Sequence, residues 1–331
     1  MAMNVPLELL SHICSLACTD DGTTVKSLRL TSRYIEQVCS PMQYQSLSIT
    51  RHEDLSHLVM KLHHVPDYLR RIYHLHISLP FSEPSSRLQQ NVNDVISLLI
   101  LASPTLETLS FSTPSDTISP VVIARVFRIP FPRLTELAVH GNYPFPNPES
   151  TKMPLLEWLH LSGNRNPYGL LPTLKDSFPN ITHLRISGLS MASSFARQLE
   201  SYMKAHHESA VHSSLDLEEE DWLSLRAPVT LPPIHSPLPL RLQRIFITAR
   251  IGADKRLSSV KKDAAMIDTL LACIDSHMKW RGDLGRKDGL HLALDMPDEV
   301  EPASSSPSSL YTSLYEDWAN RLMGGLGCWA N

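Results

Sequence analysis

Glycine is scarce in this chain: 12 of its 331 residues are glycine, and the 25 prolines outnumber them two to one. Phosphate-binding loops need glycines at fixed spacings, and neither a P-loop nor a dinucleotide-binding motif is present. Long apolar runs are missing as well, since the longest, residues 98–102, is far shorter than the ~20 residues that span a bilayer. We therefore predict neither a phosphate-binding loop nor a membrane-spanning helix.

An excess of charge of one sign is also absent. The 30 Lys and Arg residues and the 34 Asp and Glu residues leave a formal net charge of −4, which gives no general electrostatic reason to bind nucleic acid or an acidic membrane. The 5 cysteines are odd in number and far apart, which suits a reducing compartment. The amino terminus has no basic start and an early acid, Glu8, so we predict no signal peptide and expect a cytoplasmic or nuclear protein.

Catalytic motifs are missing too. The chain has no G-x-S-x-G nucleophile elbow and no H-E-x-x-H pair. Cys14 and Cys18 would share one face of a helix, but a zinc site needs about four ligands, and no second Cys or His pair lies near them in the sequence. We interpret the two cysteines as small core residues, and we predict no catalytic residue, cofactor or metal ion.

Leucine is the residue that the chain has in excess, with 50 copies, about 15% of the sequence. From residue 72 onward, a phrase with apolar residues at its first, fourth and sixth positions occurs six times. This spacing suits a short strand whose alternate side chains point into a continuous core, as in leucine-rich repeats. The phrases lie at residues 72–77, 106–111, 134–139, 156–161, 181–186 and 242–247.

The phrases are regularly spaced in only part of the chain. The central leucines at positions 75, 109, 137, 159 and 184 are 34, 28, 22 and 25 residues apart, and the next phrase is centred 61 residues further on, at Ile245. A regular leucine-rich repeat is ~20–29 residues long. We therefore predict an α/β protein with an irregular leucine-rich-repeat-like solenoid over residues 51–301, ending in a strand at Leu292 and Leu294. The alternative is an ordinary open α/β domain.

The first fifty residues have a different pattern. Pro6 suits the first turn of a helix, and Leu9, Leu10, Ile13 and Leu16 make a wide apolar face behind it. Two further short helices are predicted at residues 23–30 and 32–38. Three short helices bury little surface by themselves, so we expect an apolar face to be left for a partner.

Residues 4–49 resemble an F-box. The resemblance rests on residues 5–10 (VPLELL) with Ile13, on residues 28–34 (LRLTSRY) and on residues 44–47 (YQSL), in the family's order and spacing. The chain departs from the family's pattern at Val5, where leucine is usual, and in a longer loop at residues 19–23. The alternative is a small amphipathic helical cap on the rest of the chain.

This resemblance implies binding of a Skp-type adaptor, which links an F-box protein to a cullin–RING ubiquitin ligase. By position, the adaptor-contacting residues of the family fall on Pro6, Leu7, Leu9, Leu10, Ile13, Leu28, Leu30 and Arg33.

Polar and aromatic residues flank the inward leucines of the predicted strands. If the strands align, these side chains form columns on an exposed concave face. Histidine, aromatic and arginine side chains side by side are typical of recognition surfaces, although exposed positions can also simply tolerate polar residues. The predicted substrate-binding residues are His74, His76, Trp158, His160, His183 and Arg185.

Residues 302–331 complete the predicted organisation. A serine–proline linker leads to a last helix at residues 310–323, which Gly324 and Gly325 end. We expect the apolar face of this helix to dock on the end of the solenoid as a cap. The predicted domains are therefore the F-box-like unit at 1–50, the solenoid at 51–301, and the linker with its capping helix at 302–331.

These features together predict a non-enzymatic substrate-recognition adaptor of a Skp–cullin–F-box type ubiquitin ligase. The F-box-like helices would bind the Skp-type adaptor and, through it, the cullin–RING ligase, while the solenoid would bind an unknown protein substrate. One alternative is a protein-interaction scaffold whose F-box-like cap does not lead to ubiquitination. Another is an enzyme whose site is assembled from residues distant in the sequence.

Overall fold

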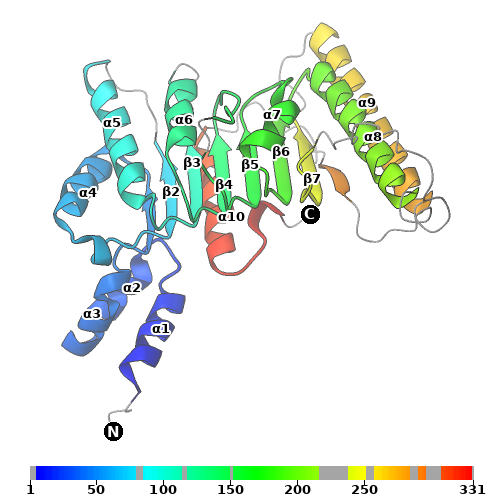
Figure 1. The fold of residues 1–331 in the computed structure, drawn as a ribbon. Helices are drawn as coiled ribbons and strands as arrows, with labels where there is room; N and C mark the ends of the chain where they lie inside the picture. The colour runs from blue at the N-terminus through cyan, green and yellow to red at the C-terminus, as the bar shows by residue number, and fades with distance from the viewer. Residues whose placement is uncertain are drawn as a thin grey trace. The chain divides into compact units, whose positions relative to one another are not determined.

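The structure is a computed structural model that describes residues 5–79, 85–113, 118–149, 152–215, 238–250, 257–283, 290–295 and 307–329. Residues 302–306 of the predicted linker lie outside these ranges. Three amino-terminal helices precede an all-parallel sheet whose eight strands follow the chain order, with helices between the strands (Figure 1). This arrangement confirms the predicted α/β class. Among the described residues, no helix combines the length and the apolar character needed to cross a membrane.

Contacts within the chain define two compact units, which are described in turn. The first contains residues 1–144, 150–163 and 301–331, and it therefore joins the amino-terminal helices and the first five strands with the last segment of the chain. The second contains residues 145–149 and 164–300.

After the amino-terminal helices, the first unit alternates between strand and helix as far as β4, which is followed by β5 with no helix described between them. Its helices are α1 (Leu7–Ala17), α2 (Thr23–Arg29), α3 (Arg33–Cys39), α4 (His52–His64), α5 (Ser85–Ala102), α6 (Ser119–Arg128) and α10 (Pro307–Leu322), with short 3₁₀ turns η1 (Ser40–Met42), η2 (Asp67–Leu69) and η3 (Gly327–Trp329). Its strands are β1 (Ser46–Ile49), β2 (His74–Ser78), β3 (Thr108–Ser112), β4 (Glu136–His140) and β5 (Trp158–Ser162).

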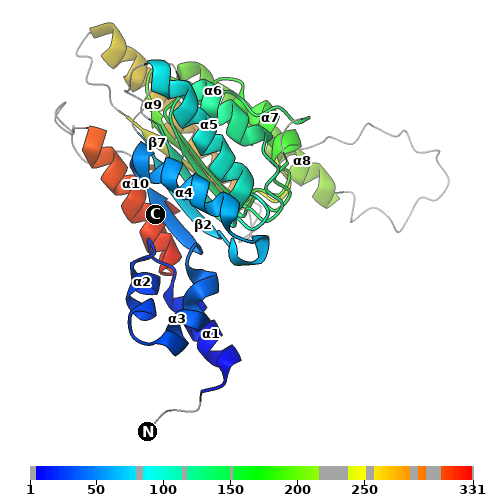
Figure 2. The same cartoon turned by 90° about the vertical axis from the view of Figure 1, so that its left-hand side faces the viewer.

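The leucine phrases form β2 to β5 of the first unit, as predicted. Leu75 lies opposite Leu109, Leu109 opposite Leu137, and Leu137 opposite Leu159. All four leucines are buried. Because side chains alternate along a strand, the leucines share one face of the sheet, and α4, α5 and α6 cover that face (Figure 2).

One strand comes from the F-box-like segment itself. Leu47, in the YQSL phrase of the resemblance, lies opposite Leu75 in the parallel pair of β1 and β2. The amino-terminal helices are thus followed directly by the first strand of the sheet.

Two glycines allow the loops after β4 and β5 to approach closely. Gly141 and Gly163 have φ angles of +141° and +118°, a region that favours glycine. A Cβ atom on Gly163 would lie 2.5 Å from the carbonyl oxygen of Gly141. The backbone N–H of Gly141 donates to the carbonyl oxygen of Ser162 at 2.8 Å, which holds the two turns together.

The C-terminal helix lies on the face of the sheet opposite α4, α5 and α6 (Figure 2). The prediction that this helix caps the end of the solenoid is therefore wrong, because α10 packs against β2 and β3 instead. Its predicted stop is confirmed: α10 ends at Leu322, and Gly324, at φ +87°, donates its N–H to the carbonyl oxygen of Arg321 at 3.0 Å.

The second unit repeats the alternation of strand and helix. Leu184 lies opposite Ile245 and Ile245 opposite Leu292, so the predicted last strand is confirmed. The long helices α8 and α9 pack against each other (Figure 1). The elements are α7 (Leu170–Ser177), β6 (His183–Leu189), α8 (Ser193–Leu215), β7 (Arg244–Ala249), α9 (Leu257–Asp283) and β8 (His291–Asp295).

Candidate functional site

The amino-terminal helices have a small core of their own. Its buried members are Cys14, Cys18, Val25, Val38, Cys39 and Met42. Burial raises the pKa of the Cys18 thiol to about 11 and that of Cys39 to about 12, so both thiols stay protonated near neutral pH. The interpretation of Cys14 and Cys18 as core residues is confirmed, and among the described residues no group of three or more His, Cys, Asp or Glu side chains is arranged to hold a metal ion.

Large apolar side chains cover the outside of the same helices. The adaptor face, as we call this surface, consists of Leu7, Leu9, Ile13, Leu16, Leu30 and Tyr34. Each of them is at least half exposed, and Leu30 is 88% exposed. So many large exposed apolar side chains on one small group of helices are typical of a protein interaction site.

The predicted adaptor-contacting residues divide between the adaptor face and the small core. Pro6, Leu7, Leu9, Ile13, Leu30 and Arg33 are exposed. Leu10 and Leu28 are half-buried and pack against the small core, so the structure gives them a role within the helices themselves. A substitution that is meant to test partner binding alone therefore belongs at Leu9 or Ile13.

Gln45 connects α1 to the sheet. Its side-chain amide donates to the carbonyl oxygen of Ser15 at 2.8 Å, and its backbone carbonyl accepts from the N–H groups of Tyr73 and His74 at 2.9 and 3.0 Å. Since Gln45 is buried, these bonds are shielded from competing water.

The opposite face of the first unit's sheet carries four of the residues predicted to bind substrate, His74, His76, Trp158 and His160. A C-terminal strap, as we call residues 307–329 of α10 and η3, packs across this face. His76 lies 5.6 Å from Tyr315 and 5.5 Å from Trp318 between ring centroids, and Trp158 lies 5.1 Å from Trp329. The expectation of an open concave face is therefore wrong at these strands.

Glu136 binds two side chains of the strap, those of Arg321 and Trp329. Its carboxylate accepts a hydrogen bond from Nε of Arg321 at 3.0 Å and one from Nε1 of Trp329 at 3.2 Å, and Nη2 of Arg321 lies 2.9 Å away. The Arg321 guanidinium also lies over the ring of Trp158, 4.7 Å from its centroid. Charge-assisted hydrogen bonds and a cation–π contact thus meet at one point of the sheet.

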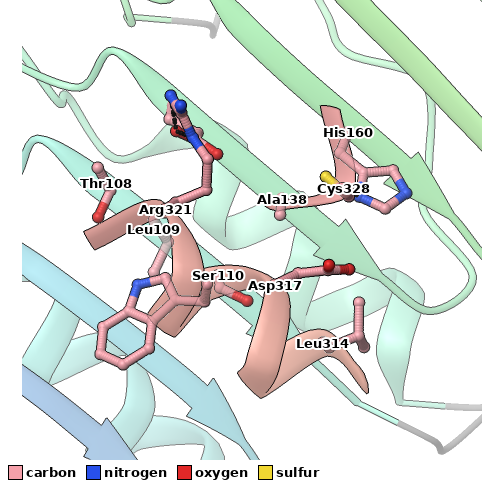
Figure 3. A pocket seen from close by; sticks show the side chains of 11 residues that line it. Thr108, Leu109, Ser110, Ala138, His160, Leu314, Asp317, Arg321 and Cys328 are labelled. Atoms are coloured by element: carbon pink, nitrogen blue, oxygen red, sulfur yellow. Dashed lines mark hydrogen bonds and ion pairs between the residues drawn. The ribbon is translucent and has the colours of Figure 1, made fainter. Parts of the chain in front are cut away.

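A small cavity of about 30 Å³ lies between the strap and β3, β4 and β5 (Figure 3). Its lining includes Glu136, His160, Trp318, Arg321 and Cys328. The Sγ atom of Cys328 is 3.6 Å from Nδ1 of His160. A cavity of this size holds about two water molecules, well below the ~300–1,000 Å³ of a small-molecule site.

Two of the predicted histidines are held by hydroxyl groups of the neighbouring strand. Nδ1 of His74 lies 3.1 Å from Oγ1 of Thr108, and Nδ1 of His76 lies 3.0 Å from Oγ of Ser110. Burial lowers the pKa of each imidazole from 6.5 to about 4. Both histidines are therefore neutral at pH 7.

The stability of the protein is expected to fall as the pH drops from 7 to 5, partly because of His76. Its pKa is about 4 in the folded chain and ~6.5 when unfolded, so the unfolded chain binds the extra proton first. Protonation of this one imidazole in the unfolded chain lowers the free energy of unfolding by ~2 kcal/mol between pH 7 and pH 5. Urea unfolding at pH 7 and pH 5 measures this drop in unfolding free energy. The drop should be ~2 kcal/mol smaller in His76→Gln than in the unmodified chain. The control is His63→Gln, which replaces an exposed histidine of α4 and should show the same drop as the unmodified chain. An equal loss in wild type and His76→Gln contradicts the prediction.

His183 and Arg185 belong to the second unit. Nη2 of Arg185 lies 3.3 Å from Oδ2 of Asp295 and donates to Oγ1 of Thr248 at 3.2 Å. The side chain of Arg185 is thus held across β6, β7 and β8, and His183 is buried.

Glu136, Arg321 and Trp329 are absent from the set of residues that the sequence singles out. One signal points to Glu136, which occupies the same column as Trp158 and lies directly opposite it in register. The pairing with Arg321 has no local signal, since 185 positions separate the two residues.

Comparisons with protein-family models, with curated proteins and with solved structures find no match for this chain. The adaptor face and the strap-covered sheet are therefore interpreted from their own geometry.

Proposed function

We propose that the chain is an F-box protein: a non-catalytic substrate-recognition subunit of a Skp–cullin–F-box type ubiquitin ligase that acts in the cytoplasm or nucleus. The adaptor face carries this proposal. Three short helices enclose a small core and leave Leu7, Leu9 and Ile13 at least half exposed, although burying such side chains is worth ~1.5–3 kcal/mol each. A partner that covers them gains this energy.

The α/β region after the helices would bind the substrate. We propose that its strands and helices form a leucine-rich-repeat-like solenoid, in which the ladder of leucines supplies the shared core. The substrate would contact the non-leucine face through His74, His76, Trp158, His160, His183 and Arg185; in the first unit the strap covers this face, so the substrate would have to displace it. Ubiquitination would then follow from proximity, because a bound substrate meets the conjugating enzyme at high effective concentration.

Co-purification of the full chain from cells tests the proposal. We expect the Skp-type adaptor and a cullin to be recovered together with the chain. Recovery of the adaptor without a cullin favours the scaffold alternative, in which no ubiquitination follows. Recovery of neither, from a chain shown to be folded by a cooperative thermal transition, overturns the proposal.

A further inference from the structure

We propose that the sheet face beneath the C-terminal strap is the docking site for one kind of partner segment: a helix with an arginine in its last turn and aromatic residues on both sides of that arginine. In this view the strap is the chain's own copy of such a segment, and the partner displaces it. The inference rests on the proposed function only in identifying the partner with the substrate.

The face beneath the strap is polar, unlike the leucine face. Within the first unit it presents hydroxyl, imidazole and carboxylate groups, namely those of His76, Thr108, Ser110, Ser112, Glu136 and His160. Polar groups are costly to bury and add little to a permanent core. Their arrangement in register suits a surface that recognises a particular partner.

The strap contacts show which chemistry this face recognises. Glu136 accepts hydrogen bonds from both Arg321 and Trp329, and Arg321 lies over Trp158. Tryptophan and arginine are the residues most enriched among those that dominate binding energy at protein interfaces. A partner segment with the same side chains would find the same carboxylate and ring.

The strap fits the face incompletely. Nε2 of His76, Nε1 of Trp318 and Oγ of Ser112 are buried and make no hydrogen bond with any described residue. The small cavity beside Trp318 and Arg321 adds a packing defect. Since buried polar atoms without partners weaken an interaction, a segment that satisfies them would bind this face better than the strap does.

Covalent attachment explains how an incomplete fit persists. A segment of the same chain is present at high effective concentration, so it occupies the face without high intrinsic affinity. A free partner must outcompete it, and any change that weakens the strap must therefore strengthen binding in trans.

The test uses the full chain and a fluorescein-labelled synthetic peptide of residues 307–331. In one variant, Trp318→Ala/Arg321→Ala, the strap is weakened; the matched control, Glu316→Ala/Met323→Ala, changes two exposed positions of the strap. We expect the weakened chain to bind the peptide at least 10-fold more tightly than the control chain. Adding Glu136→Ala to the weakened chain should remove that gain. Equal peptide affinity of the weakened and control chains, or a gain that survives Glu136→Ala, overturns the proposal.

If the weakened variant fails to fold, amide hydrogen exchange of the unmodified chain provides a second test of the same proposal. Exchange of the α10 amides at least 10-fold faster than that of the β3–β5 amides supports displacement of the strap, and equal rates contradict it. Binding of the Skp-type adaptor is measured on the same samples. Loss of adaptor binding alone counts against the proposed function, and failure of the peptide result alone counts against the docking site.

Discussion

Replacing Ile13 by aspartate is expected to weaken binding of the Skp-type adaptor about 100-fold or more. Ile13 belongs to the adaptor face and is 50% exposed. Burying the exposed half of this side chain against a partner contributes about half of the ~1.5–3 kcal/mol of a whole side chain, which corresponds to a factor of roughly 4 to 12 in the dissociation constant. An aspartate at the same place adds the cost of desolvating an unpaired charge. Calorimetric titration of the adaptor into the full chain measures the loss.

Ile100→Asp provides a matched control for Ile13→Asp. Ile100 lies on α5 and is 56% exposed, so the substitution, the helical setting and the exposure are nearly the same. We expect Ile100→Asp to bind the adaptor as the unmodified chain does. Leu10→Asp is a poorer choice, because Leu10 packs against the small core and its loss disturbs the helices themselves. Normal adaptor binding by a folded Ile13→Asp chain contradicts the assignment of the adaptor face.

Leu159→Ala is expected to lower the free energy of unfolding by ~2–5 kcal/mol. Leu159 is fully buried in β5 and lies directly opposite Leu137 in β4. Truncation removes the burial of three carbon atoms and leaves a cavity in the ladder of leucines, which the strands cannot close without losing their register. Urea denaturation measures the change as a shift of the transition midpoint.

The control for this prediction is Leu155→Ala, a leucine just before β5 that is 51% exposed. It carries the same chemical change outside the ladder, and we expect it to cost ~0.5 kcal/mol or less. If the two variants lose the same stability, Leu159 is not part of a shared core. The slope of the denaturation curve should be unchanged in both, since neither alters the surface exposed on unfolding.

The sequence alone determines the strands β2 to β8 of this protein. A phrase with apolar residues at its first, fourth and sixth positions directs alternate side chains to one face, and each of the six phrases ends in an observed strand. The end of α10 could be predicted as well, because Gly324 adopts a positive φ that most residues avoid. The strand β1 was not predicted, since its four residues alternate over too short a length to separate them from the helices before them.

Tertiary structure alone decided what covers the second face of the sheet. The sequence places Tyr315 and Trp318 on one side of a helix but says nothing about the surface that receives them. That choice depends on Glu136, Trp158 and His76, which lie 149 residues or more before the strap and come together only when the strands are in register. Tertiary structure also decided the roles of the apolar residues of α1. Leu10 and Ile13 belong to one apolar stripe in the sequence. Packing of α1 against α2 and α3 buries part of Leu10, whereas Ile13 stays half exposed and available to a partner.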